Sequence, residues 1–81
     1  MFISVKFSGL FRILAGEDQA VLDVKEGTTI QELTNLLAER FQNLPLEKKG
    51  THIIINGQVP THNQALAEGD QVRVFQMLAG G

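Results

Sequence analysis

The chain of 81 residues contains no cysteine, no tryptophan and no tyrosine. Without cysteine it has no disulfide framework, no thiol nucleophile and no thiolate metal site. This absence fits a reducing compartment, and we expect the protein to be cytoplasmic. The few phenylalanines are scattered along the chain, so stacking on nucleic-acid bases is not expected.

Long apolar runs and blocks of one charge are also missing. No apolar run exceeds three residues, whereas a membrane-spanning helix needs ~20. The N-terminus lacks the charged start and long apolar stretch of a signal peptide. Nine acidic and seven basic residues give a formal net charge of −2 without a basic face. We therefore expect neither a membrane nor a nucleic-acid partner.

Candidate catalytic and metal-binding groups are sparse. His52 and His62 are the only histidines, and zinc usually takes three or four nitrogen, sulfur or oxygen ligands. No cluster of that kind is evident, so we expect no metal site. The serines lack the G-x-S-x-G setting of a nucleophile, and the glycines match no phosphate-binding loop. We expect that the chain is not catalytic on its own.

Alternating hydrophobicity predicts two strands in the first third of the chain. The segments are "FISVKFS" and "QAVLDV". Gly9 to Asp18 supplies turn residues between them and predicts a hairpin with a long loop. The residues expected to face the core are Ile3, Val5, Phe7, Ala20, Leu22 and Val24.

An amphipathic helix is expected next. Thr29 precedes Glu32 by three residues, which is the spacing of a capping box at a helix start. The segment "NLP" is expected to end the helix, because Pro45 disfavours a helical conformation at Leu44. The apolar stripe is expected to contain Ile30, Leu33, Leu37 and Phe41, broadened by Leu36.

The remaining segments predict more strands. "HIIIN" is β-branched and is followed by Asn56-Gly57, a strong turn signal. "QVP" is expected to add a brief strand after that turn. In the last strand, Val72 and Val74 face one way, and Arg73, Phe75 and Met77 face the other. This order predicts an α+β fold in which a mixed sheet of four to five strands packs on one main helix.

The sequence ends with two glycines, two residues after the last predicted strand. Leu78, Ala79, Gly80 and Gly81 reach at most ~13–14 Å when extended, which is enough to enter a neighbouring active site. Glycine passes where a side chain would clash, because it has no Cβ atom. The domain is therefore expected over residues 1–77, with a flexible tail at 78–81. The tail presents the carboxylate of Gly81, and the alternative is a loose terminus without a function.

The outer face of the last strand is the candidate partner-binding surface. Arg73, Phe75 and Met77 are expected there, with Lys6 of the first strand close by. Exposed Phe and Met beside a functional tail suggest a docking patch. The alternative is that a loop of the same domain covers Phe75.

The chain resembles the ubiquitin-like β-grasp sulfur carriers of the MoaD/ThiS type over essentially its whole length. The resemblance rests on segments that occur in the family's order. They are "FSGLFRILAGED", "EGTTIQELTNLLAERF", "IINGQ", "LAEGDQVRVF" and the terminal "AGG".

The resemblance implies a mechanism in which Gly81 carries the reacting carboxylate. An E1-like adenylating enzyme uses ATP to adenylate this carboxylate and releases pyrophosphate. A sulfur donor such as a sulfurtransferase then produces a thiocarboxylate, which delivers sulfur to an acceptor enzyme. Gly80 lets the tail thread, Ala79 and Leu78 extend it, and the chain itself binds no cofactor.

The resemblance favours the small subunit of molybdopterin synthase, which works with a large subunit in molybdopterin biosynthesis. "FRILAGED" and "LLAERFQNL" support that branch, whereas the ending "VFQMLAGG" is closer to that of a thiazole carrier in thiamine biosynthesis. A carrier for another sulfur-requiring pathway is a further alternative. A ubiquitin-like modifier joined to proteins through Gly81, or a purely structural interaction domain, belongs to a different class.

Overall fold

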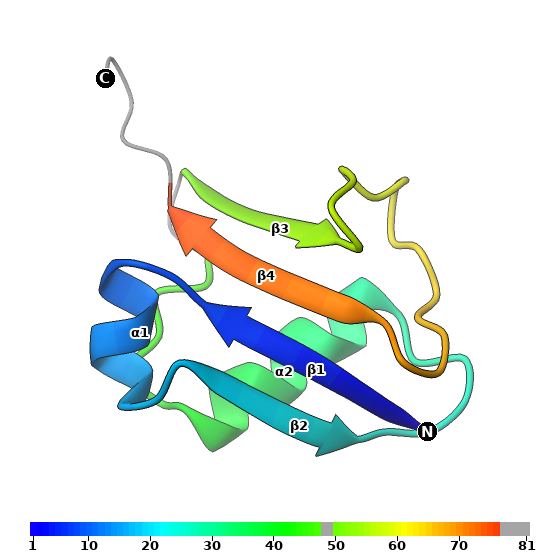
Figure 1. Ribbon diagram of the computed structural model, residues 1–81, viewed down its shortest axis with the longest axis horizontal. Helices are drawn as coiled ribbons and strands as arrows, with labels where there is room; N and C mark the ends of the chain where they lie inside the picture. The colour runs from blue at the N-terminus through cyan, green and yellow to red at the C-terminus, as the bar shows by residue number, and fades with distance from the viewer. Residues whose placement is uncertain (48–49, 77–81) are drawn as a thin grey trace.

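A four-stranded mixed sheet with two helices forms the structure. It is a computed structural model that describes residues 1–47 and 50–76 (Figure 1). The strands are β1 (Phe2–Phe7), β2 (Gln19–Asp23), β3 (Thr51–Ile55) and β4 (Gln71–Gln76), and the helices are α1 (Leu10–Ala15) and α2 (Ile30–Arg40). This arrangement confirms the α+β class and fixes the number of described strands at four.

The strands lie in the order β2-β1-β4-β3. The first strand pairs antiparallel with β2 and parallel with β4, and β4 pairs antiparallel with β3. The N-terminal and C-terminal strands are therefore neighbours at the centre of the sheet. α2 lies across one face, and neither of the two described helices covers the other face (Figure 1).

The core lies between the sheet and α2, and it contains the residues that alternation predicted. All six inward-facing positions of the first two predicted strands are buried, and so are Val72 and Val74 of β4. Leu33 and Leu37 meet them from α2. The alternate side chains of these strands therefore lie on the face of the sheet that points away from the core.

The start of α2 follows the predicted capping box. The Thr29 side chain accepts a hydrogen bond from the Glu32 backbone N–H, and the Glu32 carboxylate accepts one from the Thr29 N–H at 3.1 Å. Leu36 was predicted to broaden the buried stripe, but it is 41% exposed. It lies beyond the strip of the helix surface that the sheet covers.

The end of α2 differs from the prediction. The helix stops at Arg40, before the Asn-Leu-Pro segment. Phe41 leaves the helical conformation, and its ring packs edge-on against Phe7 with centroids 5.1 Å apart. Packing against the sheet therefore accompanies the end of the helix, ahead of any effect of Pro45.

The segment predicted as a long hairpin loop contains the short helix α1. Gly9, with φ +56°, precedes this helix, and Gly16 closes it in the left-handed conformation with its N–H bonded to the Arg12 carbonyl. Phe11 is fully buried. Burial of this ring stabilises a helix of six residues that would be marginal alone. α1 lies beside the ends of β1 and β4 (Figure 1).

The turn after β3 was predicted correctly, but the brief strand after it was not. Asn56 and Gly57 both have positive φ, and Ile55 and Gln58 exchange backbone hydrogen bonds of 2.9 and 3.0 Å across them. The pairing of Gln58 is this single bridge. The following Val59 is 85% exposed, so burial gives "QVP" no reason to continue as a strand.

Candidate functional site

The outer face of β4 carries the side chains that the sequence assigned to partner binding. Arg73 is exposed and Phe75 is half-buried, whereas Val72 and Val74 point into the core. Lys6 is the direct neighbour of Arg73 in the β1–β4 pairing, so the expected proximity of these two cations is found. The sheet itself brings them together, because β1 and β4 are parallel neighbours.

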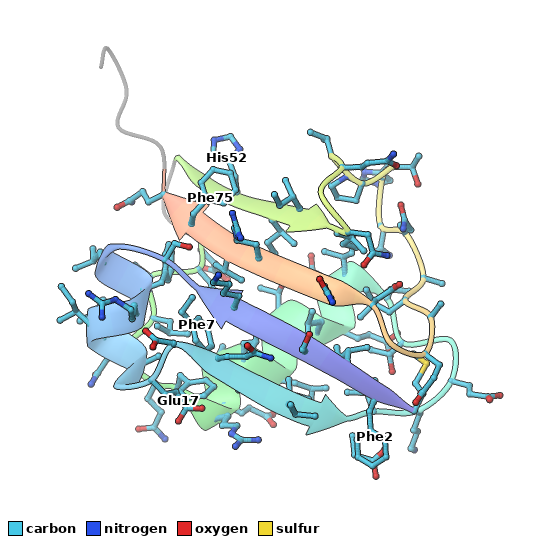
Figure 2. The ribbon with its side chains drawn as sticks, viewed as in Figure 1. Phe2, Phe7, Glu17, His52 and Phe75 are labelled. Atoms are coloured by element: carbon cyan, nitrogen blue, oxygen red, sulfur yellow. The ribbon has the colours of Figure 1, made fainter. Side chains whose placement is uncertain are left out.

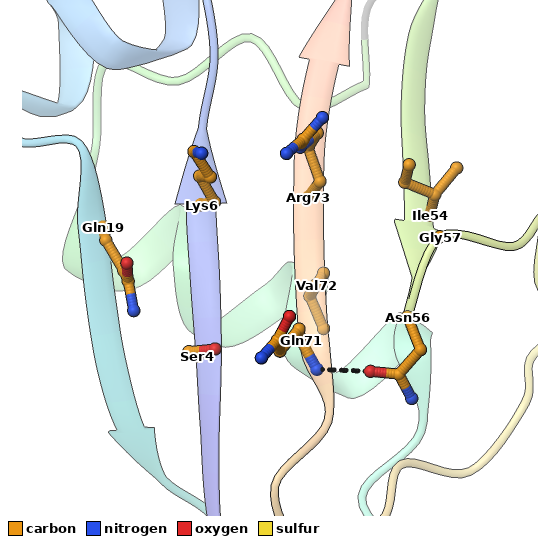
Figure 3. Close-up of a pocket in the computed structure, with 9 residues that line it drawn as sticks. All are labelled: Ser4, Lys6, Gln19, Ile54, Asn56, Gly57, Gln71, Val72 and Arg73. Atoms are coloured by element: carbon orange, nitrogen blue, oxygen red, sulfur yellow. Dashed lines mark hydrogen bonds between the residues drawn. The ribbon is translucent and has the colours of Figure 1, made fainter.

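A shallow hollow of about 430 Å³ lies over this part of the sheet. Figure 3 shows Lys6 and Arg73 side by side on neighbouring strands, between Gln19 of β2 and Ile54 of β3. The other lining residues are Ser4, Asn56, Gly57, Gln71 and Val72. Polar and cationic groups therefore dominate the middle of the open face.

Phe75 is covered on one side by a neighbouring strand. Its ring stacks on the imidazole of His52 in β3, with centroids 5.6 Å apart and planes 24° apart. Figure 2 shows the two rings together at one end of the sheet. The alternative reading placed a loop over Phe75, but the observed stacking partner belongs to β3.

His52 is one of the members of this surface that the sequence analysis did not assign to it. Alternation in "HIIIN" places His52 and Ile54 on one face, which is a usable signal. What the sequence lacked was the register that sets His52 opposite Phe75. A surface built across strands requires the pairing as well as the pattern.

A polar network anchors the start of β4. The Asn56 side-chain N–H donates to the Asp70 carboxylate at 2.9 Å, and the Asn56 side-chain oxygen accepts from the Gln71 N–H at 2.9 Å. The second Asp70 oxygen accepts from the Ala67 N–H at 2.8 Å. The buried Asp70 carboxylate thus fixes the turn before β4 relative to the turn after β3.

The tail residues assigned a role from the sequence lie outside the described residues. They are Met77, Leu78, Ala79, Gly80 and Gly81. Within the described residues, no three histidine, aspartate or glutamate side chains come together as a metal site. No helix among these residues is long and apolar enough to cross a membrane.

The order of the strands and the helix across one face define a ubiquitin-like β-grasp fold. The sequence profile of the ThiS family matches residues 5–81. The chain therefore belongs to the ThiS family, the ubiquitin-like sulfur carrier family that its sequence resembles. Comparison with curated proteins found no match.

Solved structures share the fold over almost their whole length. SAMP1 from Haloferax volcanii is 19% identical, with a TM-score of 0.87 and full coverage of both chains. A putative molybdopterin converting factor subunit 1 from Pyrococcus furiosus is 24% identical, with a TM-score of 0.85 and coverage of 96% of this chain and 99% of that one. One chain in the complex of subunits 1 and 2 of the molybdopterin-converting factor from Helicobacter pylori is 22% identical. Its TM-score is 0.71, with full coverage of both chains.

Proposed function

We propose that the protein is a sulfur carrier whose reactive group is the carboxylate of Gly81. The observation that carries the proposal is the match to the ThiS family, which extends to residue 81 and includes the Gly-Gly ending. The central strand β4 leads from the sheet toward that ending. The outer side chains of β4 then lie on the surface that an enzyme holding the tail would meet.

In the proposed reaction, an E1-like enzyme activates the carboxylate with ATP. A Gly81 carboxylate oxygen bonds to the α-phosphorus of ATP, and pyrophosphate leaves. A sulfur donor, such as a sulfurtransferase carrying a persulfide, then attacks the acyl carbon and AMP leaves. Reduction of the resulting acyl disulfide by a thiol gives the thiocarboxylate and a disulfide. The chain contributes the carboxylate, a tail without side chains at its last two positions, and a docking face.

Molybdopterin biosynthesis is the pathway that we propose. The Pyrococcus furiosus neighbour is named as a putative subunit 1 of a molybdopterin converting factor, and in Helicobacter pylori subunits 1 and 2 form a complex. By analogy, this chain would be the sulfur-carrying small subunit that works with a large subunit. The thiazole pathway and other sulfur-requiring pathways are the alternatives within the family.

A protein modifier is the second candidate function. SAMP1 of Haloferax volcanii, a small archaeal modifier protein, has nearly the same fold. In this role, Gly81 would be joined to lysines of target proteins.

Purified protein, the E1-like enzyme of the same organism and ATP test the first step that both functions share. We expect release of pyrophosphate that depends on this protein and is lost when Gly81 is deleted. Absence of release from the intact chain would contradict the proposal. Conjugate ladders in cells that depend on Gly81 would favour the modifier, and sulfur transfer without ladders would favour the carrier.

A further inference from the structure

Two cations occupy facing positions in the centre of the open sheet. Lys6 of β1 and Arg73 of β4 are paired neighbours, and both side chains are exposed. Adjacent strands lie ~4.8 Å apart. Like charges at such positions repel, which lowers the stability of the sheet. A partner that brings negative charge to this position would relieve the repulsion.

Carboxylates do not relieve this repulsion within the described part of the chain. The residues that line the hollow include both cations and neither aspartate nor glutamate (Figure 3). The ion pairs found among residues 1–47 and 50–76 are those of Met1 with Asp23 and of Arg12 with Asp18. Yet the whole chain has a net charge of −2. The hollow therefore carries local positive charge on a chain that is acidic as a whole.

We propose that the hollow binds an acidic segment of the E1-like activating enzyme, with carboxylates of that enzyme seated between Lys6 and Arg73. This inference rests on the proposed function, because it names the chemistry of the partner surface. The guanidinium of Arg73 can hold a carboxylate with two parallel hydrogen bonds, and Lys6 adds a mobile donor. The amide side chains of Gln19 and Gln71 border the same hollow and offer further donors.

The position of the hollow suits an enzyme that engages the tail. Arg73 is on the same face of β4 as Phe75, two residues closer to the start of the strand. An enzyme that follows β4 to the C-terminal end meets the cation pair and the His52–Phe75 stack on one surface. The aromatic stack would supply affinity. The two cations would favour an acidic partner surface and raise the rate of association.

The test compares K6Q/R73Q with wild type as substrates of the E1-like enzyme in the pyrophosphate release assay. Two lost charge contacts of 0.2–1 kcal/mol each imply a rise in KM of about two- to thirtyfold at low salt. Raising the salt concentration should increase the wild-type KM more steeply than that of K6Q/R73Q, because salt screens the contacts that the variant lacks.

The control is K25Q/R40Q, which changes the net charge equally. Lys25 follows β2 and Arg40 ends α2, and neither lines the hollow. Its KM should stay within twofold of the wild-type value. An equal rise in both double variants would show that only net charge matters and would overturn the inference.

A zero-length carbodiimide cross-linker provides a second, direct measurement. It should join the Lys6 amine to an aspartate or glutamate of the activating enzyme, in a peptide that mass spectrometry identifies. K6R keeps the charge but should lose that cross-link while retaining its KM.

The outcomes separate the inference from the proposed function. A wild-type chain that releases no pyrophosphate would overturn both. Normal release with an unchanged KM for K6Q/R73Q, or cross-links to the enzyme that never include Lys6, would overturn the acidic docking site alone.

Discussion

Asn56 connects two parts of the chain that are distant in sequence. Its amide donates to Asp70 and accepts from Gln71, so both ends of one side chain are used. The positive φ of Asn56 suits asparagine better than most residues. A single amide thereby sets where β4 begins, and β4 positions Arg73 and Phe75.

The variant N56D should destabilise the fold. It replaces a donor with a second carboxylate that faces the buried Asp70. Lost hydrogen bonding and charge repulsion should lower the free energy of unfolding by about 1–3 kcal/mol. Urea denaturation measures the change. The matched control is N43D, which makes the same change at an exposed position, and equal stability of the two variants would contradict the role of Asn56.

Phe75 is the candidate anchor for a partner enzyme. Truncation in F75A should weaken binding to the E1-like enzyme by about 1–3 kcal/mol, because aromatic anchors carry much of an interface's energy. Calorimetric titration measures the affinity. The control V59A removes a highly exposed apolar side chain elsewhere and should leave it unchanged. Unaltered binding by folded F75A would refute the anchor.

At the scale of elements, the capping box of α2 is the clearest local signal in the sequence. The variant T29A removes the side-chain oxygen that accepts from Glu32. We expect a loss of about 0.5–2 kcal/mol in the free energy of unfolding, measured by thermal or urea denaturation. T29S keeps the acceptor and should retain most of that stability. If T29A matches wild type, the cap contributes little here.

The strands and α2 were predictable because each has a local pattern. Alternation named the buried side of β1, β2 and β4, and the capping box located the start of α2. α1 lacks such a pattern, since six residues between Gly9 and Gly16 also fit a turn-rich loop. Its formation depends on burial of Phe11 at the end of the sheet, which is a tertiary effect.

The site was only partly predictable for the same reason. Alternation on β4 placed Arg73 and Phe75 on the outer face without knowledge of the neighbouring strands. The stack of His52 on Phe75 and the opposition of Lys6 and Arg73 depend on strand order and register. Strand order and register cannot be derived from the hydrophobic pattern of a single strand. The roles of residues 78–81 remain predictions from the family resemblance.

At the scale of the whole molecule, the two faces of the sheet have different roles. α2 and the core residues occupy one face of the sheet (Figure 1). The opposite face presents the aromatic stack (Figure 2) and the cations and amides of the hollow (Figure 3). Because β4 lies between β1 and β3, it is held on both sides. The strand that leads to the proposed reactive end is thus a central strand of the sheet.

Extension of the chain by one residue after Gly81 should abolish adenylation without changing the fold. The added residue moves the terminal carboxylate and places a Cβ where the tail would thread. Pyrophosphate release by the E1-like enzyme measures the reaction, and circular dichroism checks the fold. Alanine is the smallest added residue that both moves the carboxylate and introduces a Cβ. Normal pyrophosphate release from the extended chain would refute the requirement.

The central claim is that Gly81 carries sulfur as a thiocarboxylate. Intact-protein mass spectrometry after incubation with the E1-like enzyme, ATP, a sulfur donor and a thiol reductant tests it most directly. We predict a mass gain equal to the difference between sulfur and oxygen, with fragmentation assigning it to Gly81. A chain that is adenylated but never gains this mass, or gains it at another residue, would contradict the claim.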